Sequence, residues 1–413
     1  MARIFYLGAP SQVHLPPDAT VLQAIEETGG NTGNLLIGHA IKRHLRAECI
    51  ITRGNLLGWD YVAKNFDRVV VGASNFLYRE FDFGRWADFL EATKLPCTVF
   101  GLGAQAPEYG CRVEVPAGTR RLLKVISERS TTLGVRGHWT ASILSELGIT
   151  NLRVIGCPAV YWNCKPSLEF KPITRRRPLA VAVNGAANGV QHASDAVAAK
   201  ELEAQLARLS FQRGYPYFLQ NETDLAAIAA GLPGALETYR LELLMQNYGL
   251  SDIGPRRFIE FVKSNTRIHF KVGEWRAAME RFDFVVGSRF HGSLIAALAG
   301  VPCFVYAHDA RTKELCELLR LPHRPVTEQG SVDIDALYDS LDLSPLERTY
   351  RQLYENYIQF LEENGFKHNL AMRRQEGRNG AESLRHTELT DNLPTLTPEF
   401  VSGSAEPEAP RVS

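Results

Sequence analysis

The residues best suited to chemistry lie in one turn, Gly287-Ser288-Arg289-Phe290-His291-Gly292, which joins an apolar strand-like run (282–286) to a small-residue helix-like run (293–299). If a helix begins near His291, its first backbone N–H groups have no partner within the helix, and the helix dipole adds partial positive charge there. An arginine and a histidine beside such a helix start make an anion site, whose expected ligand is a phosphate or a carboxylate. A single histidine is usually structural, but the position of His291 between Arg289 and glycines predicts that the two residues serve function together.

The next segment of the chain again places charged residues after a strand-like run. This run, at 301–306, leads to Asp309 and Arg311, which open another helix-like run at 313–319. The stretch 287–322 resembles the polysaccharide pyruvyl transferase family, whose signature is a Gly-x-Arg-x-His-Gly turn, then Gly-x-Pro, then Asp-x-Arg-x-x-Glu-Leu and a closing Pro. The residues that fill this signature are Gly287, Arg289, His291, Gly292, Gly300, Pro302, Asp309, Arg311, Glu314, Leu315 and Pro322. Asp309 and Arg311 either contact the substrate or form a pair that braces the site.

The resemblance implies a reaction and a role for each residue of the turn. It implies an enzyme that moves a pyruvyl group from phosphoenolpyruvate to two hydroxyls of a sugar, forming a ketal on an exopolysaccharide, capsule or cell-wall glycan precursor. Phosphoenolpyruvate is then the donor substrate, the acceptor is a glycan or a lipid-linked saccharide, and no cofactor is needed. His291 and Arg289 would be the catalytic residues, and Ser288 and Gly292 would contact the substrate. Guanidinium groups bind phosphates and carboxylates in bidentate geometry, which suits this donor.

Two positions in the first half of the chain are further candidates for substrate contact. Arg136 ends a strand-like run (132–135), at a place comparable to that of an arginine in the resembling family. This suggests a second anion ligand, although a helix-capping arginine is an equal alternative. Gly103 lies in the glycine-containing segment 101–107, which either lets the backbone approach a substrate or is a plain connecting loop.

The family also has two segments with an aspartate that this chain lacks. Its usual Asn-x-Gly-Asp turn is matched by Asn31 and Gly33 but ends in Asn34, and its Gly-Asp-Pro segment carries Cys157 at the aspartate position. Asn31, Gly33 and Asn34 precede a helix-like run, so they are candidates for binding a sugar hydroxyl, or they only start the helix. Cys157 is not expected to be a nucleophile, because no neighbouring residue in the sequence would depress the pKa of its thiol.

Two other functions are consistent with the same residues. A GT-B-type glycosyltransferase that uses a nucleotide-sugar would bind its diphosphate at the same anion site. A non-catalytic sugar-binding relative would fit the replacement of two aspartates by Asn34 and Cys157, but the presence of Arg289 and His291 counts against it.

Strand-like and helix-like runs alternate along the chain, which predicts an α/β fold with parallel sheets. The strand-like runs are 3–7, 49–52, 68–71, 98–100, 132–135, 179–183, 217–220, 267–270, 282–286 and 303–306. We expect two Rossmann-like domains facing a cleft, as in GT-B enzymes: 1–172 on the acceptor side and 178–342 on the phosphoenolpyruvate side. The short basic run at 175–177 is the expected linker, residues 343–366 are an amphipathic helix that packs back on the domains, and 373–413 are a disordered tail.

Composition narrows the class of protein further. The chain has 46 basic and 46 acidic residues, which argues against a nucleic-acid partner, and its seven cysteines are scattered, which favours a reducing compartment. No metal-binding motif appears, so no metal is expected. No signal peptide or membrane-spanning run is visible, so the predicted location is the cytoplasm, and any association with a glycan-assembly complex is expected to be peripheral.

Overall fold

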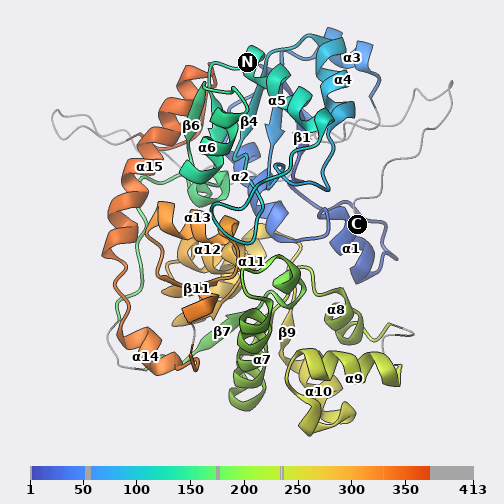
Figure 1. The fold of residues 1–413 in the computed structure, drawn as a ribbon, viewed down its shortest axis with the longest axis vertical. Coiled ribbons are helices and arrows are strands. Elements are labelled where there is room, and N and C mark those ends of the chain that lie inside the picture. The colour runs from blue at the N-terminus through green and yellow to red at the C-terminus, as the bar shows by residue number, and fades with distance from the viewer. Residues whose placement is uncertain are drawn as a thin grey trace. The chain divides into compact units, whose positions relative to one another are not determined.

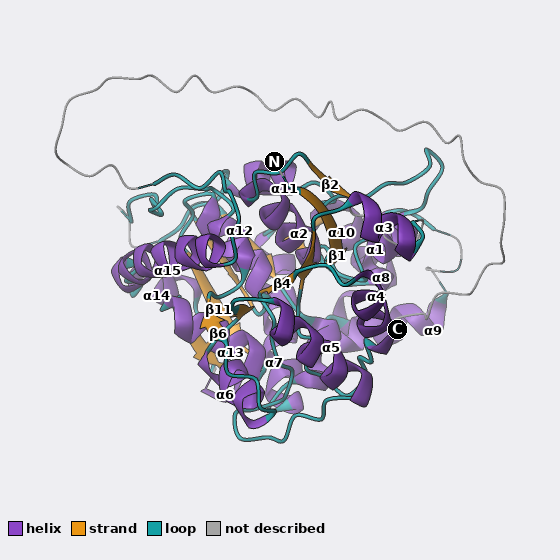
Figure 2. Ribbon diagram, turned by 90° about the horizontal axis from the view of Figure 1, so that it is seen from above, coloured by secondary structure: helices purple, strands orange, loops and turns teal. Residues whose placement is uncertain are grey.

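The computed structural model describes residues 2–51, 57–173, 177–232, 234, 237–328 and 330–372. Residues Met1–Ala371 form one compact unit, which contains two larger parallel sheets and one small one (Figure 1). Viewed from above, helices lie on both sides of the strands (Figure 2).

The first sheet has the strand order β2-β1-β3-β4, and all its strands are parallel. Its strands are β1 (Arg3–Gly8), β2 (Cys49–Ile51), β3 (Arg68–Gly72) and β4 (Cys97–Phe100). A separate parallel pair, β5 (Leu133–Val135) and β6 (Leu152–Val154), continues this layer through a bridge between Leu102 and Val135. The helices of this half are α1 (Val21–Glu27), α2 (Gly33–His44), α3 (Trp59–Asn65), α4 (Gly84–Thr93), α5 (Ala117–Arg129) and α6 (His138–Glu146), followed by the 3-10 turn η2 (Pro158–Tyr161).

The second sheet has the strand order β12-β11-β10-β7-β8-β9, again with parallel pairs throughout. Its strands are β7 (Val181–Asn184), β8 (Tyr217–Phe218), β9 (Thr266–Arg267), β10 (Phe284–Gly287), β11 (Cys303–Ala307) and β12 (His323–Pro325). The helices are α7 (Ala196–Arg213), α8 (Thr223–Ala229), α9 (Thr238–Asn247), α10 (Pro255–Asn265), α11 (Val272–Met279), α12 (Phe290–Leu298), α13 (Ala310–Leu319), α14 (Ile334–Asp339) and α15 (Ser344–Glu363). The 3-10 turns are η3 (Ala187–His192), η4 (Ser251–Ile253) and η5 (Val326–Glu328).

The sheets form because their strands are apolar on both faces, as parallel strands covered by helices on both sides must be. All four residues of β10 and all five of β11 are buried. One continuous apolar cluster joins the two halves, since it includes Tyr6 of β1, Tyr161 of η2 and Val285 of β10. The strand β10 is therefore packed into a core that it shares with the first half of the chain.

The predicted α/β class with two Rossmann-like halves is confirmed by these parallel sheets. Strands β6 and β12 have no counterpart among the strand-like runs of the sequence, because their residues are only partly buried and the runs were recognised by continuous apolar character. The domain boundaries at 172 and 178 stay predictions, because residues 174–176 of the expected linker lie outside the described residues. The segment predicted as a disordered tail, 373–413, also lies outside them.

Helix α15 runs from α14 to a position beside β6 in the first half (Figure 1). The ring of Tyr357 stacks on Tyr161 with 4.4 Å between ring centroids. Its hydroxyl is 2.9 Å from Nδ1 of His44, whose Nε2 lies 2.9 Å from the carbonyl oxygen of Tyr161. Burial lowers the pKa of His44 to about 3, so this imidazole is neutral and needs both hydrogen bonds. Asn356 on the same helix donates to the carbonyl oxygen of Val154 at 2.6 Å, which ties α15 to β6.

Truncation of Tyr357 is expected to destabilise the protein strongly. Tyr357→Ala removes a fully buried aromatic ring and should lower the free energy of unfolding by about 3–5 kcal/mol, the usual cost of such a truncation. Tyr357→Phe keeps the ring but leaves His44 Nδ1 without its partner and should cost about 1–3 kcal/mol. Urea denaturation measures both values, and a cost below about 1 kcal/mol for Tyr357→Ala would contradict this packing of α15.

Candidate functional site

The predicted turn lies where the fold places ligands in open parallel sheets, at the carboxyl end of a central strand. β10 ends at Gly287, Arg289 is the N-cap residue, and α12 begins at Phe290. Gly287 is needed because the strands come close here: a Cβ on it would lie 1.9 Å from the carbonyl oxygen of Asn184 in β7. The turn is thus held against β7, and the backbone N–H of Arg289 donates to Asn184 Oδ1 at 3.2 Å.

Arg289 is 9% exposed and is fixed by three groups of its own half. Its Nε donates to the carbonyl oxygen of Gly185 at 2.9 Å, and its Nη2 contacts the side chains of Asn221 and Glu222. Glu222 offsets part of the guanidinium charge and holds the group in one orientation. Arg289 is therefore a preorganised cation next to the start of α12.

His291 stands at the junction of the two halves. Its Nε2 is 3.5 Å from Sγ of Cys157, and a Cβ on Gly33 at the start of α2 would lie 2.9 Å from its Nδ1. Burial, and then the positive charges of Arg136, Arg311 and Arg289, lower the pKa of His291 well below its ordinary value. The imidazole is therefore neutral at neutral pH in the ligand-free protein.

Arg136 is buried and has one side-chain nitrogen without a hydrogen-bond partner among the described residues. It is 2% exposed, its Nε donates to the carbonyl oxygen of Gly101 at 2.9 Å, and its Nη2 has no hydrogen-bond partner. Burial lowers the pKa of its guanidinium. The carboxylates of Glu314 and Asp309 act on Arg136 electrostatically, but Nη2 has no hydrogen-bond partner. Because a buried donor without a partner is costly, this nitrogen is suited to bind an anion. The room left by Gly103 is filled by Arg136 itself, because a Cβ there would lie 2.6 Å from Cδ of Arg136.

Asp309 and Arg311 form an ion pair, with 3.2 Å between Arg311 Nη2 and Asp309 Oδ2. Asp309 also caps α13 by accepting from the N–H of Thr312 at 2.7 Å, and it accepts from Gln105 Nε2 at 3.0 Å. Burial alone would raise the pKa of Asp309, but Arg311, His308 and these hydrogen bonds outweigh it and hold the pKa well below its usual range. The ion pair is compatible with the interpretation that these residues brace the site, which stays a prediction, and Arg311 also acts electrostatically on His291.

Asn31, Gly33 and Asn34, the predicted site residues at the start of α2, make different contacts. Asn31 Oδ1 accepts from the N–H of Gly33 at 2.8 Å and so shapes the helix start. The side-chain amide of Asn34 donates to the carbonyl oxygens of Thr28 at 3.1 Å and Gly29 at 3.4 Å, so it stabilises the preceding turn. Of the three, Gly33 lies against His291.

We call Arg136, Arg289, His291 and Arg311 the basic cluster. Each arginine acts electrostatically on His291, and the cluster is assembled from both halves of the chain. Arg289 and Arg311 are paired with Glu222 and Asp309, whereas Arg136 forms no ion pair of this kind with a described residue. The other two predicted residues of the turn contact residues outside the basic cluster. Ser288 Oγ donates to Glu203, and Gly292 lies against Asn184 and Gln220.

Several residues of the site have no motif in the sequence. Gln220 follows β8, is 1% exposed and has a side-chain nitrogen without a hydrogen-bond partner, next to Gly33 and Gly292. Glu222 pairs with Arg289, and Asn184 ends β7 and binds the turn. Their shared signal is a polar residue at or just after the end of a predicted strand, which is where the carboxyl edge of a parallel sheet presents its side chains.

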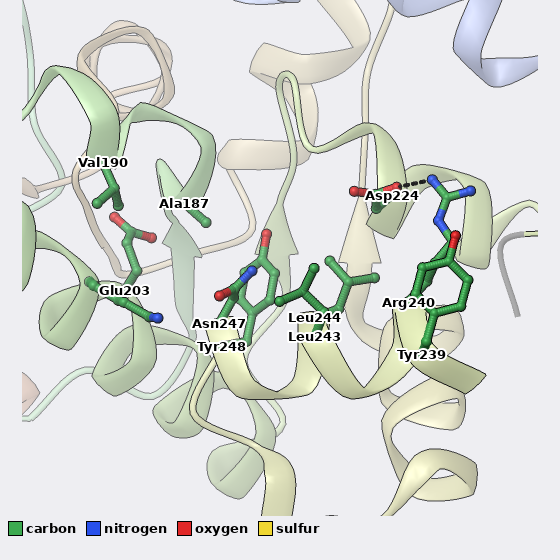
Figure 3. A pocket seen from close by; sticks show the side chains of 11 residues that line it. Ala187, Val190, Glu203, Asp224, Tyr239, Arg240, Leu243, Leu244, Asn247 and Tyr248 are labelled. Carbon is green, nitrogen blue, oxygen red and sulfur yellow. Dashed lines mark hydrogen bonds and ion pairs between the residues drawn. The ribbon is translucent and has the colours of Figure 1, made fainter. Parts of the chain in front are cut away.

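A separate cavity of about 580 Å³ lies between η3, α7, α8 and α9 (Figure 3). None of the residues predicted from the sequence lines it. We place the candidate site at the basic cluster, because the unpartnered nitrogen of Arg136 indicates what kind of ligand the cluster needs.

The chain is thus an α/β protein with two larger parallel sheets and a basic cluster at the carboxyl ends of their strands. The family model for polysaccharide pyruvyl transferase matches residues 31–310, and the chain belongs to this family. Membership indicates a transferase that acts on polysaccharides and a glycan as its acceptor.

Solved structures to which the chain is similar include two epimerases and a glycosyltransferase. The UDP-GlcNAc 2-epimerase of Methanocaldococcus jannaschii is 11% identical, with 88% of this chain and 99% of that chain covered and a TM-score of 0.44. The UDP-N-acetylglucosamine 2-epimerase of Rickettsia bellii is 9% identical, with 88% and 96% covered and a TM-score of 0.42. The glycosyltransferase SnogD of Streptomyces nogalater is 13% identical, with 87% and 96% covered and a TM-score of 0.32. No protein of curated function matches the sequence.

Two further observations concern the described part of the chain only. Its helices include none that is long and apolar enough to cross a membrane. Its histidine, cysteine, aspartate and glutamate side chains form no group of three or more that could hold a metal ion.

Proposed function

We propose that the protein transfers a pyruvyl group from phosphoenolpyruvate to two hydroxyls of a sugar in an exopolysaccharide, capsule or cell-wall glycan precursor, forming a cyclic ketal. The observation that carries this proposal is the buried Nη2 of Arg136, a nitrogen of the basic cluster that has no hydrogen-bond partner. Phosphoenolpyruvate has both a carboxylate and a phosphate, and a cluster of three arginines offers enough donors for both groups.

In the proposed reaction the methylene carbon of phosphoenolpyruvate is protonated, and the first sugar hydroxyl adds to the resulting oxocarbenium-like centre. The proton released by this hydroxyl balances the one gained by the methylene carbon. The second hydroxyl then displaces phosphate and closes the ring, and its proton leaves with the phosphate. Arg136, Arg289 and Arg311 stabilise the negative charge that builds up on the departing phosphate.

His291 is proposed to carry the proton in the second step. Because its imidazole is neutral before the donor binds, it is able to accept the proton of the second hydroxyl and pass it to the departing phosphate. Cys157 is proposed to position His291 through the contact at 3.5 Å. Burial raises the pKa of the Cys157 thiol, although Arg136 opposes this, so the pair consists of two neutral groups.

The proposal is tested by titrating phosphoenolpyruvate into the purified protein by calorimetry, with UDP-sugars as competitors. Arg289→Lys keeps a positive charge opposite Glu222 but lacks the guanidinium fork. Loss of one charge-assisted hydrogen bond costs about 1.5–3 kcal/mol, so the affinity of this variant should fall about 10- to 100-fold. Binding of a UDP-sugar in place of phosphoenolpyruvate would refute the proposed donor and favour a glycosyltransferase.

A further inference from the structure

The cavity between η3, α7, α8 and α9 has the size of a ligand site, since its 580 Å³ falls within the range of about 300–1,000 Å³ usual for such pockets. The residues that line it are Ala187, Val190, Lys200, Glu203, Asp224, Tyr239, Arg240, Leu243, Leu244, Asn247 and Tyr248. Figure 3 shows side chains of α9 along one side and Glu203 of α7 on the other.

The charges of the cavity do not favour an anion. Its two cations, Lys200 and Arg240, face two carboxylates, Glu203 and Asp224, and Arg240 is paired with Asp224 at 3.0 Å. A nucleotide diphosphate or a phosphorylated ligand would need a surplus of positive charge. A neutral ligand with many hydroxyls, in contrast, is served by carboxylate, amide and ammonium groups placed side by side.

The apolar part of the lining suits the flat faces of sugar rings. Tyr239 is 67% exposed and Leu243 is 56% exposed, although both are large apolar side chains, and both lie on α9 at the cavity. Tyr248, the residue that follows this helix, is buried and also lines the cavity. Aromatic rings with a polar tip are suited to surfaces that are partly apolar and partly wet.

Glu203 connects the cavity to the basic cluster. Its carboxylate accepts hydrogen bonds from Ser288 Oγ and, at 3.2 Å, from the hydroxyl of Tyr217. Gly185 separates it from Arg289: a Cβ on Gly185 would lie 2.3 Å from Glu203 Oε2, and the carbonyl oxygen of Gly185 accepts from Arg289 Nε at 2.9 Å. Only one layer of residues therefore lies between the cavity and Arg289.

We propose that this cavity binds a saccharide unit of the acceptor glycan, and that Glu203 and Ser288 couple its occupancy to the donor site. The inference deepens the proposed function, since it rests on a glycan acceptor and locates where a unit next to the modified sugar is held. A bound saccharide fixes Glu203 and, through Ser288, the turn that carries Arg289. The protein therefore binds each of the two ligands, acceptor and donor, more tightly when the other is bound.

The first experiment measures binding of sugars to the full chain by saturation-transfer NMR, with and without phosphoenolpyruvate. The probes are methyl glycosides of galactose, glucose, mannose and N-acetylglucosamine. Tyr239→Ala should weaken the binding of the glycoside that binds wild type by about tenfold, because an exposed stacking face is lost. Tyr61→Ala is the matched control, because Tyr61 is also exposed, at 50%, and lies on α3. The affinity for phosphoenolpyruvate alone should be the same in both variants.

The second experiment tests the coupling. Ser288→Ala removes the hydroxyl that bonds to Glu203. This variant should bind the glycoside as wild type does, but the glycoside should no longer increase its affinity for phosphoenolpyruvate. The inference is overturned if Tyr239→Ala binds glycosides like wild type, or if none of the glycosides binds wild type in the presence of phosphoenolpyruvate. If a glycoside binds at Tyr239 but phosphoenolpyruvate does not bind at all, the saccharide site stands and the donor assignment fails.

Discussion

Replacing Arg136 with methionine is expected to reduce phosphoenolpyruvate affinity at least about 100-fold and, at the same time, to stabilise the ligand-free protein. The guanidinium is 2% exposed and its Nη2 has no hydrogen-bond partner, so the free protein bears the cost of a poorly compensated buried charge. Replacing buried charged groups by apolar ones of similar size often stabilises proteins, by about 1–4 kcal/mol. We expect a gain near the lower end, about 1 kcal/mol, because the hydrogen bond from Nε to Gly101 is lost as well.

Urea denaturation without ligand and calorimetry with phosphoenolpyruvate measure the two effects separately. Arg348→Met on α15 is a suitable control, because Arg348 is exposed and its replacement should change neither quantity by much. A variant at position 136 that is less stable and still binds phosphoenolpyruvate would show that Arg136 is a structural residue whose charge is satisfied within the protein. Opposite changes in stability and affinity are the signature of a group kept for its ligand.

The fold could be predicted from the sequence because its central strands are continuous apolar runs. The five buried residues of β11 and the four of β10 are examples, and the helix-like run after each completes the α/β pattern. β12 escaped this reasoning because its three residues, His323–Pro325, are only partly buried at the sheet edge. The strand exists because it pairs with β11, and pairing with a distant segment leaves no local pattern.

The site was predictable where residues of one segment act together and not where the fold brings distant residues together. Arg289 and His291 share a turn with a recognisable family signature. Gln220 and Glu222 share the site with them, but their only local signal is a place at or just after the end of a predicted strand, and this signal does not indicate their role. The contact between Cys157 and His291 joins residues 134 positions apart and follows from the packing of the two halves.

Glu314, another residue of the family signature, also makes a contact with a residue distant in the sequence, Thr140. Its carboxylate accepts from the N–H of Thr140 at 2.7 Å and from the hydroxyl of Thr140 at 2.8 Å. It therefore fixes α13 of one half to α6 of the other, close to Arg136. A residue of this kind contributes to the site by holding its two halves in register.

His291→Asn is expected to lower turnover by about 10²- to 10⁴-fold, the usual contribution of a proton-transferring side chain.

A second expected effect of His291 is the uptake of a proton when the donor binds. In the free protein the pKa of His291 is well below its ordinary value, mainly because of burial, so the imidazole is neutral. A bound phosphoenolpyruvate brings negative charge beside the ring and raises this pKa. Between the two pKa values, donor binding therefore takes up a proton, and affinity increases as pH falls through this window.

Calorimetry in two buffers with different ionisation enthalpies measures this proton uptake. The phosphate of the donor itself titrates near pH 6, so the quantity of interest is the difference between wild type and His291→Asn. Cys157→Asp gives an independent check, because a carboxylate at the position of Sγ, 3.5 Å from Nε2, would favour the imidazolium form before the donor binds. Proton uptake on donor binding should be smaller in this variant than in wild type. The acid limb of its pH–activity profile should lie at higher pH, because the neutral imidazole that accepts the hydroxyl proton becomes protonated at a higher pH. Equal uptake in wild type and His291→Asn would mean that His291 does not change its charge on donor binding, and its role would then be restricted to a neutral hydrogen bond.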